Sequence, residues 1–503
     1  MAIDLLIIHP GNQAVTYQSL ESTGFTSVST PFWAPLLANY TRKKGYDTAI
    51  LDTNIDGWDV SKISDFDPKM VAVMVYGHQP SASTQTMQAA KKIIKDIKET
   101  YDVLVVCGGQ HPSALPEQTV RETEADYIIK GEAVYTLEGL LDTQKNNGDF
   151  SDVAGLYYEE DGNIVSTKPA QNVVDLDNTL DDYAWDLLPS FDNYRAHQHQ
   201  CLQDFEKSTD SNFLDIRAPY AAFQGSLGCP YACHYCMIND IFGGSGIRYW
   251  SVDKLVSWID RVVQQGVRNI RFDDELFVLH PKRVDKLCDI LIERGYDLNM
   301  WVYARVTTIR QKLLAKMKKA GFNWVCLGIE SGNVDVRDDV GKVKNKAEGD
   351  NLLINDVVQM IQDSGMWLQG NYIFGLPEDT IETMQQTLDM AKEQNCEFIN
   401  FYSAMAYPGS PLYREAVEKG LKLPDTWDGY SQHSYECTPL PTRHISAAEV
   451  LQFRDNAFHD YCEDPSYLKL VNDKFGPKAQ KHIEDMCKIK LKRKLLEDQS
   501  VVV

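Results

Sequence analysis

The chain has 503 residues, of which 43% are hydrophobic and 24% are charged, as in an ordinary globular protein. A chain of this length is expected to form two or three domains. The net charge of −22 disfavours a nucleic acid substrate, whose phosphates it would repel, and no apolar run approaches the roughly 20 residues that cross a bilayer.

The first residues and the cysteines favour a reducing compartment. Asp4 stands where a secretory signal would be basic, so residues 4–9 are predicted to be a strand and the protein to be cytoplasmic. Without such a signal, the eleven cysteines are expected to be reduced thiols or metal ligands rather than disulfides. Eight of them are isolated in the sequence, and most of these should be buried: Cys107, Cys201, Cys288, Cys326, Cys396, Cys437, Cys462 and Cys487.

Residues 1–145 alternate short apolar runs with helical patterns, which predicts a doubly wound parallel sheet with crossover helices. The predicted strands are 4–9, 48–52, 70–76, 103–109 and 126–131. Ligands of such a sheet bind beyond the carboxyl ends of the strands. Gly108 and Gly109 would let a nucleotide-like group approach the backbone, although glycines at such places are also common turn residues.

Residues 146–215 are polar and contain prolines, so they are predicted to connect two domains rather than to form a core. His197 and His199, with Cys201 just beyond, suggest a metal site. No matching partner is visible in the sequence, so we do not expect one.

Residues 216–420 return to the alternation of strand and helix, which predicts a partial barrel. Its predicted strands are 221–224, 269–272, 300–303, 324–328, 367–373 and 398–403. Chemistry in such barrels lies on the loops that follow the carboxyl ends of the strands.

The loop after the first of these strands carries Cys229, Cys233 and Cys236 in the spacing C-x-x-x-C-x-x-C. Three thiolates would leave one iron of a four-iron cluster open to a ligand. A structural zinc site is the alternative, but zinc usually takes four ligands, and His234 lies too cramped inside the triplet to be the fourth. The spacing therefore favours a [4Fe-4S] cluster.

The triplet, with Tyr235 just before its last cysteine, resembles the signature of radical S-adenosylmethionine (SAM) enzymes. The resemblance implies that the open iron binds the amino and carboxylate groups of SAM, which is cleaved to a 5′-deoxyadenosyl radical. It assigns roles at successive strand ends: Asp273, Asp274 and Glu275 to the amino group, Arg305 to the carboxylate, Glu330 and Ser331 to ribose hydroxyls or the amino acid end, and Gly375 to the adenine side.

The first 140 residues, above all 105–112 and 125–132, resemble the cobalamin-binding domain of one large radical SAM subclass. The resemblance implies cobalamin contacts from Tyr76, Gly108, Gly109, Gln110, Gly131 and Glu132. The D-x-H-x-x-G motif that supplies a lower histidine ligand is absent from the sequence. His9 and His78, at strand ends, are therefore expected to be hydrogen-bonding groups of loops rather than cobalt ligands.

Residues 421–503 are predicted to be a helical segment that closes one side of the substrate cavity, beginning with a capping box from Ser446 to Glu449. The basic run 488–494 is expected to be the solvated face of the last helix. Four aromatic side chains are candidates to line the cavity: Tyr402, Tyr407, Tyr413 and Tyr430.

Together these features predict an α/β protein in which a cobalamin-binding sheet precedes a partial (β/α)6 radical SAM barrel. The expected function is a cobalamin-dependent methyltransferase that acts on an unactivated carbon of a small or medium metabolite. It would use a [4Fe-4S] cluster, SAM and cobalamin as cofactors, and a reductant such as flavodoxin or ferredoxin. One alternative is a cyclase or ring-rearranging enzyme that does not methylate, like the anaerobic ring cyclase of chlorophyll synthesis. The other is an inactive cobalamin sensor or carrier, which the intact cysteine triplet disfavours.

Overall fold

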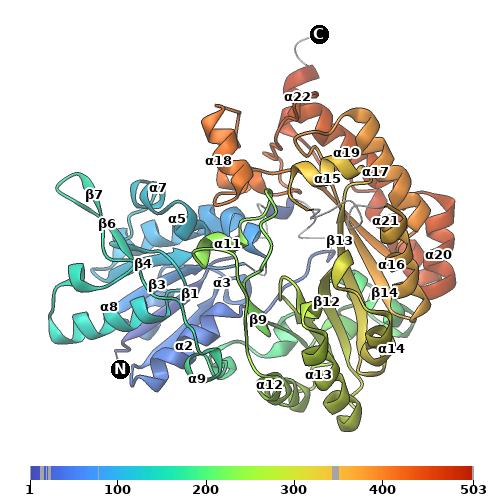
Figure 1. The fold of residues 1–503 in the computed structure, drawn as a ribbon. Helices are drawn as coiled ribbons and strands as arrows, with labels where there is room; N and C mark the ends of the chain where they lie inside the picture. Colours follow the sequence, from blue (N-terminus) through green and yellow to red (C-terminus); the bar gives the residue numbers. More distant parts are fainter. Residues whose placement is uncertain are drawn as a thin grey trace.

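A computed structural model describes residues 2–11, 16–18, 20, 24–77, 79–342 and 351–500. The described residues form two large sheets, each flanked by helices, and a separate two-stranded ribbon, and the chain ends in a group of helices beside the second large sheet (Figure 1). His78 lies outside the described residues, so its predicted role as a loop hydrogen-bonding group is not addressed by the structure.

The first sheet has the strand order β2-β1-β3-β4-β5-β6-β7. Its first five strands are parallel and confirm the predicted ones: β1 (Leu5–His9), β2 (Thr48–Asp52), β3 (Met70–Val75), β4 (Leu104–Gly109) and β5 (Tyr127–Ile129). Alternate residues of each strand face opposite layers. Leu5 and Ile7 pack with α2 (Trp33–Lys43) and α8 (Val134–Asn146), whereas Leu6 and Ile8 pack with α5 (Pro80–Thr100) and α7 (Pro116–Glu122).

The segment predicted to be a mere connection contributes to both the sheet and the core, so that prediction is wrong. Strands β6 (Leu156–Glu160) and β7 (Asn163–Ser166) form an antiparallel hairpin that pairs with β5. Further along, Tyr183 and Trp185 are buried and stack at 4.9 Å between ring centroids. The ring centroids of Trp185 and Phe223, a residue of the second sheet, lie 6.0 Å apart. These buried aromatic side chains attach the otherwise polar segment to the core.

The second sheet is an open, fully parallel half-barrel with the order β15-β14-β13-β12-β11-β8. Its six strands confirm the predicted ones: β8 (Tyr220–Phe223), β11 (Asn269–Phe272), β12 (Asn299–Arg305), β13 (Phe322–Glu330), β14 (Trp367–Phe374) and β15 (Phe398–Ser403). The longer helices between them are α12 (Val252–Gln264), α13 (Pro281–Arg294), α14 (Gln311–Lys319), α16 (Asn351–Asp363) and α17 (Ile381–Gln394).

The C-terminal segment is helical, as predicted, with α19 (Ala447–Cys462), α20 (Pro465–Phe475), α21 (Pro477–Cys487) and α22 (Lys494–Ser500). The predicted capping box is confirmed, because Ser446 Oγ accepts from Glu449 N and Glu449 Oε2 accepts from Ser446 N at 2.8 Å. The basic run does not form a helix face, contrary to prediction. Most of it lies between α21 and α22, and Arg493 is buried with its Nε 2.8 Å from Asp455 Oδ2.

The eight cysteines outside the triplet are all buried, which confirms their prediction as core residues. Over the ranges that the structure describes, no helix is both long and apolar enough to cross a membrane.

Candidate active site

The three cysteines of the triplet lie on a loop whose neck is a short antiparallel ribbon of β9 (Ser226–Leu227) and β10 (Arg248–Tyr249). Gly228 has a φ of +91°, and a Cβ there would lie 2.5 Å from the Gly246 carbonyl oxygen, so only glycine fits. At the middle of the loop, His234 N donates to Val340 O at 2.9 Å. Segments distant in sequence therefore hold the loop against the carboxyl end of the half-barrel.

The triplet supplies three thiol donors from one loop. Cys233 is buried, whereas Cys229 and Cys236 are half-buried, and the loop between β9 and β10 contains no other cysteine. A closed structural zinc site takes four protein ligands, so three thiols fit a four-iron cluster with one open iron better than a structural zinc ion.

Arg305 ends β12 beside this loop. Its side chain is buried, its Nη1 donates to Cys233 Sγ at 3.7 Å, and the guanidinium lies 4.3 Å from the centroid of the Tyr231 ring. A planar cation held next to a cluster ligand is suited to bind the carboxylate of a ligand on the neighbouring iron.

The three acidic residues after β11 lie in three different environments. Asp274 accepts from Gly225 N at 2.7 Å and from Ser226 Oγ at 2.5 Å, so both of its oxygens fix the start of the cysteine loop. Asp273 Oδ1 lies 2.7 Å from Arg271 Nε.

Glu275 is the remaining member of this acidic group. Burial raises the pKa of its carboxyl to about 8, with a further contribution from Asp273 and Asp274. Its charge acts on the thiols of Cys229 and Cys236, which places it beside the triplet. Among the hydrogen bonds and ion pairs of the described residues, none involves Glu275. Its oxygens are therefore available to an ammonium group of a ligand.

The residues predicted after β13 and β14 are largely engaged by the protein. Glu330 has a φ of +74°, and its Oε1 lies 2.6 Å from Lys342 Nζ. Ser331 is fully buried, with its Oγ 3.2 Å from Thr387 Oγ1. Gly375 has a φ of +81°, and a Cβ there would overlap Val450 of α19, so this glycine allows close packing of the helix.

The first sheet has a topological switch point between β1 and β3, where ligands of such sheets bind. A cavity of about 100 Å³ lies there, lined among others by His9, Met74, Tyr76 and Gly77. Burial lowers the pKa of His9, which keeps its imidazole neutral. Of the residues predicted to contact cobalamin, Tyr76 lines this cavity.

The other residues predicted to contact cobalamin lie on the adjacent strand ends. Gly109 has a φ of +138°, and a Cβ there would overlap the Val75 carbonyl, while Gly108 packs against Met74. Gln110 is buried, and its Oε1 has no hydrogen-bond partner within the described ranges. This oxygen can therefore accept a hydrogen bond from a bound ligand.

Gly131 and Glu132 follow β5. Gly131 donates its N–H to Ser113 Oγ at 3.0 Å. Glu132 is buried, forms an ion pair with Arg248 of β10 and accepts from Val173 N at 2.6 Å. Glu132 therefore joins the loop after β5 to the cysteine ribbon.

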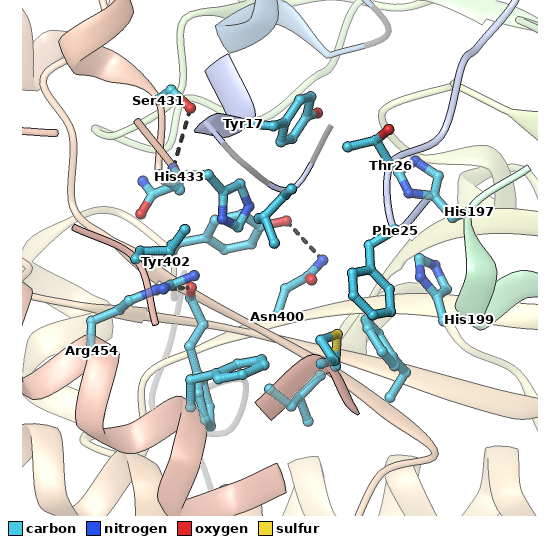
Figure 2. A pocket seen from close by; sticks show the side chains of 18 of the residues that line it. Tyr17, Phe25, Thr26, His197, His199, Asn400, Tyr402, Ser431, His433 and Arg454 are labelled. Carbon is cyan, nitrogen blue, oxygen red and sulfur yellow. Dashed lines mark hydrogen bonds between the residues drawn. The ribbon is translucent and has the colours of Figure 1, made fainter. Parts of the chain in front are cut away.

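A larger cavity of about 570 Å³ lies between the start of α5, the inner face of the half-barrel and the C-terminal segment (Figure 2). Tyr402 and Tyr407 line it, whereas Tyr413 and Tyr430 do not. Tyr430 packs instead into the core between α5 and the first sheet, which corrects its predicted place. Residues of the C-terminal segment line one side of this cavity. That the cavity holds the substrate stays a prediction.

Several polar residues of this cavity were not predicted from the sequence, among them Arg271, His433 and Arg454. Arg271 was detectable, because a charged residue inside a buried parallel strand needs a partner. It donates from Nη2 to Tyr303 OH at 2.6 Å, and Gln79 of the first domain donates to the same hydroxyl. His433 and Arg454 lie on a loop and a helix that carry no motif.

Two families match the chain. The B12 binding domain family matches residues 24–141, and the Radical SAM superfamily matches residues 224–391. An uncharacterized methyltransferase of Pyrococcus horikoshii is 27% identical over 473 residues, which are 92% of this chain and 93% of that protein. The anaerobic magnesium-protoporphyrin IX monomethyl ester cyclase of Rubrivivax gelatinosus is 26% identical over 404 residues, 77% of this chain and 66% of the cyclase.

The fold is similar to that of the radical S-adenosylmethionine methyltransferase TsrM from Kitasatospora setae, solved with cobalamin and a [4Fe-4S] cluster bound. The TM-score is 0.66 at 16% sequence identity, covering 93% of this chain and 90% of TsrM.

Proposed function

The chain combines a B12 binding domain with a radical SAM domain and so belongs to the cobalamin-binding radical SAM enzymes; from this we propose that it methylates an unactivated carbon of a small or medium metabolite. When bound, the cluster with SAM supplies a 5′-deoxyadenosyl radical and methylcobalamin supplies the methyl group. The protein holds these groups in position and excludes water.

The proposal rests on the position of the large cavity, which lies between the cysteine loop and the edge of the first sheet. Tyr303, which lines the cavity, and Arg305, which contacts Cys233, are two residues apart on β12 and so face the same side of the strand. At the other end, Gln79 follows β3 of the first sheet and also lines the cavity. A substrate there would meet both the SAM side and the cobalamin side.

The residues of the proposed site would bind the cluster and SAM. The thiolates of Cys229, Cys233 and Cys236 would hold three irons, with SAM on the fourth. Arg305 would bind the SAM carboxylate through its planar fork. Glu275 would accept a hydrogen bond from the SAM ammonium group. Both oxygens of Asp274 already accept hydrogen bonds from Gly225 and Ser226 at the start of the cysteine loop. A small electron carrier such as flavodoxin or ferredoxin would supply the reducing electron.

A cyclase that does not methylate is the second candidate, favoured by the similarity to the anaerobic ring cyclase. The cavity volume of about 570 Å³ lies in the range of sites for drug-sized ligands, about 300–1,000 Å³, and suits a small or medium substrate in either reaction.

Anaerobic reconstitution with iron, sulfide, cobalamin, a low-potential reductant and SAM tests the proposal. We expect 5′-deoxyadenosine from the wild-type protein and none from Cys233→Ala, which should also lose the absorbance of the cluster. Cys288→Ala, which removes a thiol buried in α13, is the matched control and should keep both signals. Absence of 5′-deoxyadenosine from the wild-type protein would contradict the enzyme proposal.

SAM with a deuterated methyl group then separates the two candidate reactions. Transfer of the label to a product, detected by mass spectrometry, supports methyl transfer. Formation of 5′-deoxyadenosine with an unlabelled cyclised product supports the cyclase.

A further inference from the structure

The large cavity is a cationic chamber inside a strongly acidic protein. The whole chain has a net charge of −22, yet four buried guanidinium groups surround this cavity. Arg271 and Arg454 line it. Arg217 and Arg493 lie behind its wall. Arg217 Nη2 donates to Thr26 O at 2.7 Å and Arg493 Nη2 donates to Gln432 O at 2.9 Å, and both acceptor residues line the cavity.

Carboxylates compensate only part of this positive charge. Asp273 pairs with Arg271, and a single carboxylate, Asp455, is shared by two arginines: its Oδ1 lies 2.9 Å from Arg454 Nη1 and its Oδ2 lies 2.8 Å from Arg493 Nε.

Arg217 has no carboxylate of this kind. Its guanidinium donates to the carbonyls of Ala196, Gly24 and Thr26, and none of the ion pairs between described residues includes it. The four guanidinium groups therefore exceed the two carboxylates that pair with them. A buried charge without a counter-charge raises the free energy of the folded protein. A bound anion would supply the missing negative charge at this wall.

Two histidines add unused hydrogen-bonding atoms to the same wall. Burial lowers the pKa values of both His199 and His433 to about 3, and the neighbouring arginines contribute, so both rings are neutral at physiological pH. Within the described ranges, Nε2 of His199 and Nδ1 of His433 have no hydrogen-bond partner. Figure 2 shows His433 with Arg454 on one side of the cavity and His199 on the other.

Aromatic side chains fill the space between these polar ends. Tyr17, Phe25 and Tyr402 line the cavity and appear in Figure 2 between the two histidines. Flat apolar walls of this kind suit a planar, weakly polar body.

We propose that the substrate is an anion whose carboxylate or phosphate group binds Arg454 and His433, while its planar apolar body lies between the aromatic side chains. Arg454 donates from Nε to Phe401 O and from Nη1 to Asp455 Oδ1, which fixes its position. Its Nη2 makes no hydrogen bond to the described residues and is the nitrogen left for a ligand. The inference rests on the proposed function in one respect, namely that this cavity holds the substrate.

Calorimetry on the protein reconstituted with cluster and cobalamin tests the inference with three matched probes: 1-naphthylacetate, 1-naphthyl phosphate and the uncharged 1-naphthylacetamide. At least one anion should bind about tenfold or more tightly than the amide, as expected for a charge-assisted hydrogen bond. The anion that binds more tightly identifies the class as carboxylate or phosphate. Equal affinity for anion and amide, or no binding of either anion, would overturn the inference.

Variants locate the anion. Arg454→Gln should weaken anion binding about tenfold and leave amide binding unchanged, and Arg454→Lys, which keeps the charge, should lose less. Lys469→Gln on the exposed face of α20 removes a cation elsewhere and should have no effect. Unchanged anion affinity in Arg454→Gln would contradict the assignment.

Cobalamin is a competing occupant of the cationic wall. If the anions bound only to protein without cobalamin, the wall would belong to the cofactor and the inference would fall. Probe binding does not depend on turnover. Anion binding without 5′-deoxyadenosine formation would therefore overturn the proposed function alone, and turnover without anion preference would overturn this inference alone.

Discussion

At the scale of single residues, adjacent carboxylates in one loop have different uses. Asp274 and Glu275 follow the same strand, yet Asp274 accepts two hydrogen bonds at the start of the cysteine loop, while Glu275 lies beside the thiols with its oxygens available. The resemblance to radical SAM enzymes assigned Asp273, Asp274 and Glu275 together to the SAM amino group. It could not separate them, because the direction of each side chain depends on loop geometry that a motif does not contain.

Glu275→Gln should weaken SAM binding about tenfold or more. A bound ammonium group would favour the ionised form of Glu275, and the neutral amide cannot supply that charge-assisted acceptor. Calorimetric titration of the reconstituted protein with SAM measures the affinity. Asp274→Asn is the matched variant, and we expect it to lower thermal stability and iron content first, because its carboxylate fixes the loop. If Glu275→Gln bound SAM normally and Asp274→Asn lost SAM affinity without losing stability, the assignment would be reversed.

Asp379 gives a prediction about pH. Its carboxylate accepts from Gly375 N at 3.0 Å and Leu376 N at 2.9 Å, in the loop after β14, and burial raises its pKa to about 6. Because an unfolded aspartate titrates near 4, the folded protein retains this proton between about pH 4 and 6 when the unfolded chain has lost it. The contribution of Asp379 to stability therefore falls as the pH rises through this window, by at most about 3 kcal/mol for a shift of about two pKa units.

The difference in unfolding free energy between wild type and Asp379→Asn isolates this contribution from the other acids. We expect the difference to decrease from pH 4 to pH 6.5 and then to level off. Asp389→Asn, an exposed position on α17, should give a difference that stays nearly constant. A wild-type advantage that grew with pH would show that the folded carboxyl has a lowered pKa instead.

At the scale of elements, alternation of apolar runs with helical patterns was enough to predict the eleven parallel strands of the two large sheets in the described residues. The hairpin of β6 and β7 was missed although Asp161 and Gly162 form its two-residue turn, with φ values of +50° and +79°. An Asp-Gly pair between such runs is a strong hairpin signal. The cationic wall of the cavity could not be predicted, because its residues come from elements far apart in sequence.

The glycines at the edge of the first sheet provide a matched test of element geometry. Gly109 and Gly131 both have positive φ values, so alanine is strained at either position. A Cβ at Gly109 would also overlap the Val75 carbonyl, whereas at Gly131 it meets open space. Gly131→Ala should cost about 1 kcal/mol and retain cobalamin, while Gly109→Ala should cost several-fold more and lose it.

Thermal unfolding and cobalamin absorbance after gel filtration measure the two effects. Equal loss of stability in both alanine variants would mean that backbone strain alone, and not the close approach of β3 and β4, makes Gly109 necessary.

At the scale of the whole molecule, the C-terminal segment reaches across to the cobalamin-binding domain. Trp427 donates from Nε1 to Glu122 Oε2 at 2.7 Å, and its ring meets that of His111 edge-on at 4.4 Å between centroids. Gln85 of α5 donates to Tyr430 O at 3.5 Å. The Glu132–Arg248 ion pair and the Gln79–Tyr303 hydrogen bond are further contacts between the first domain and the rest of the chain.

Trp427→Ala should therefore loosen the cobalamin-binding domain without disturbing the cluster site. Removing a buried tryptophan typically costs about 3–5 kcal/mol, and here the lost packing lies between domains. We expect less cobalamin per chain after gel filtration, an unchanged iron content, and faster hydrogen exchange in α5 and α7. Trp58→Ala is the control, because Trp58 donates to Asp96 within the same domain. Its loss should lower stability without selectively opening α7. If Trp427→Ala reduced iron and cobalamin equally, the two cofactor regions would be coupled through the C-terminal segment, and the molecule would behave as one cooperative unit instead of two joined ones.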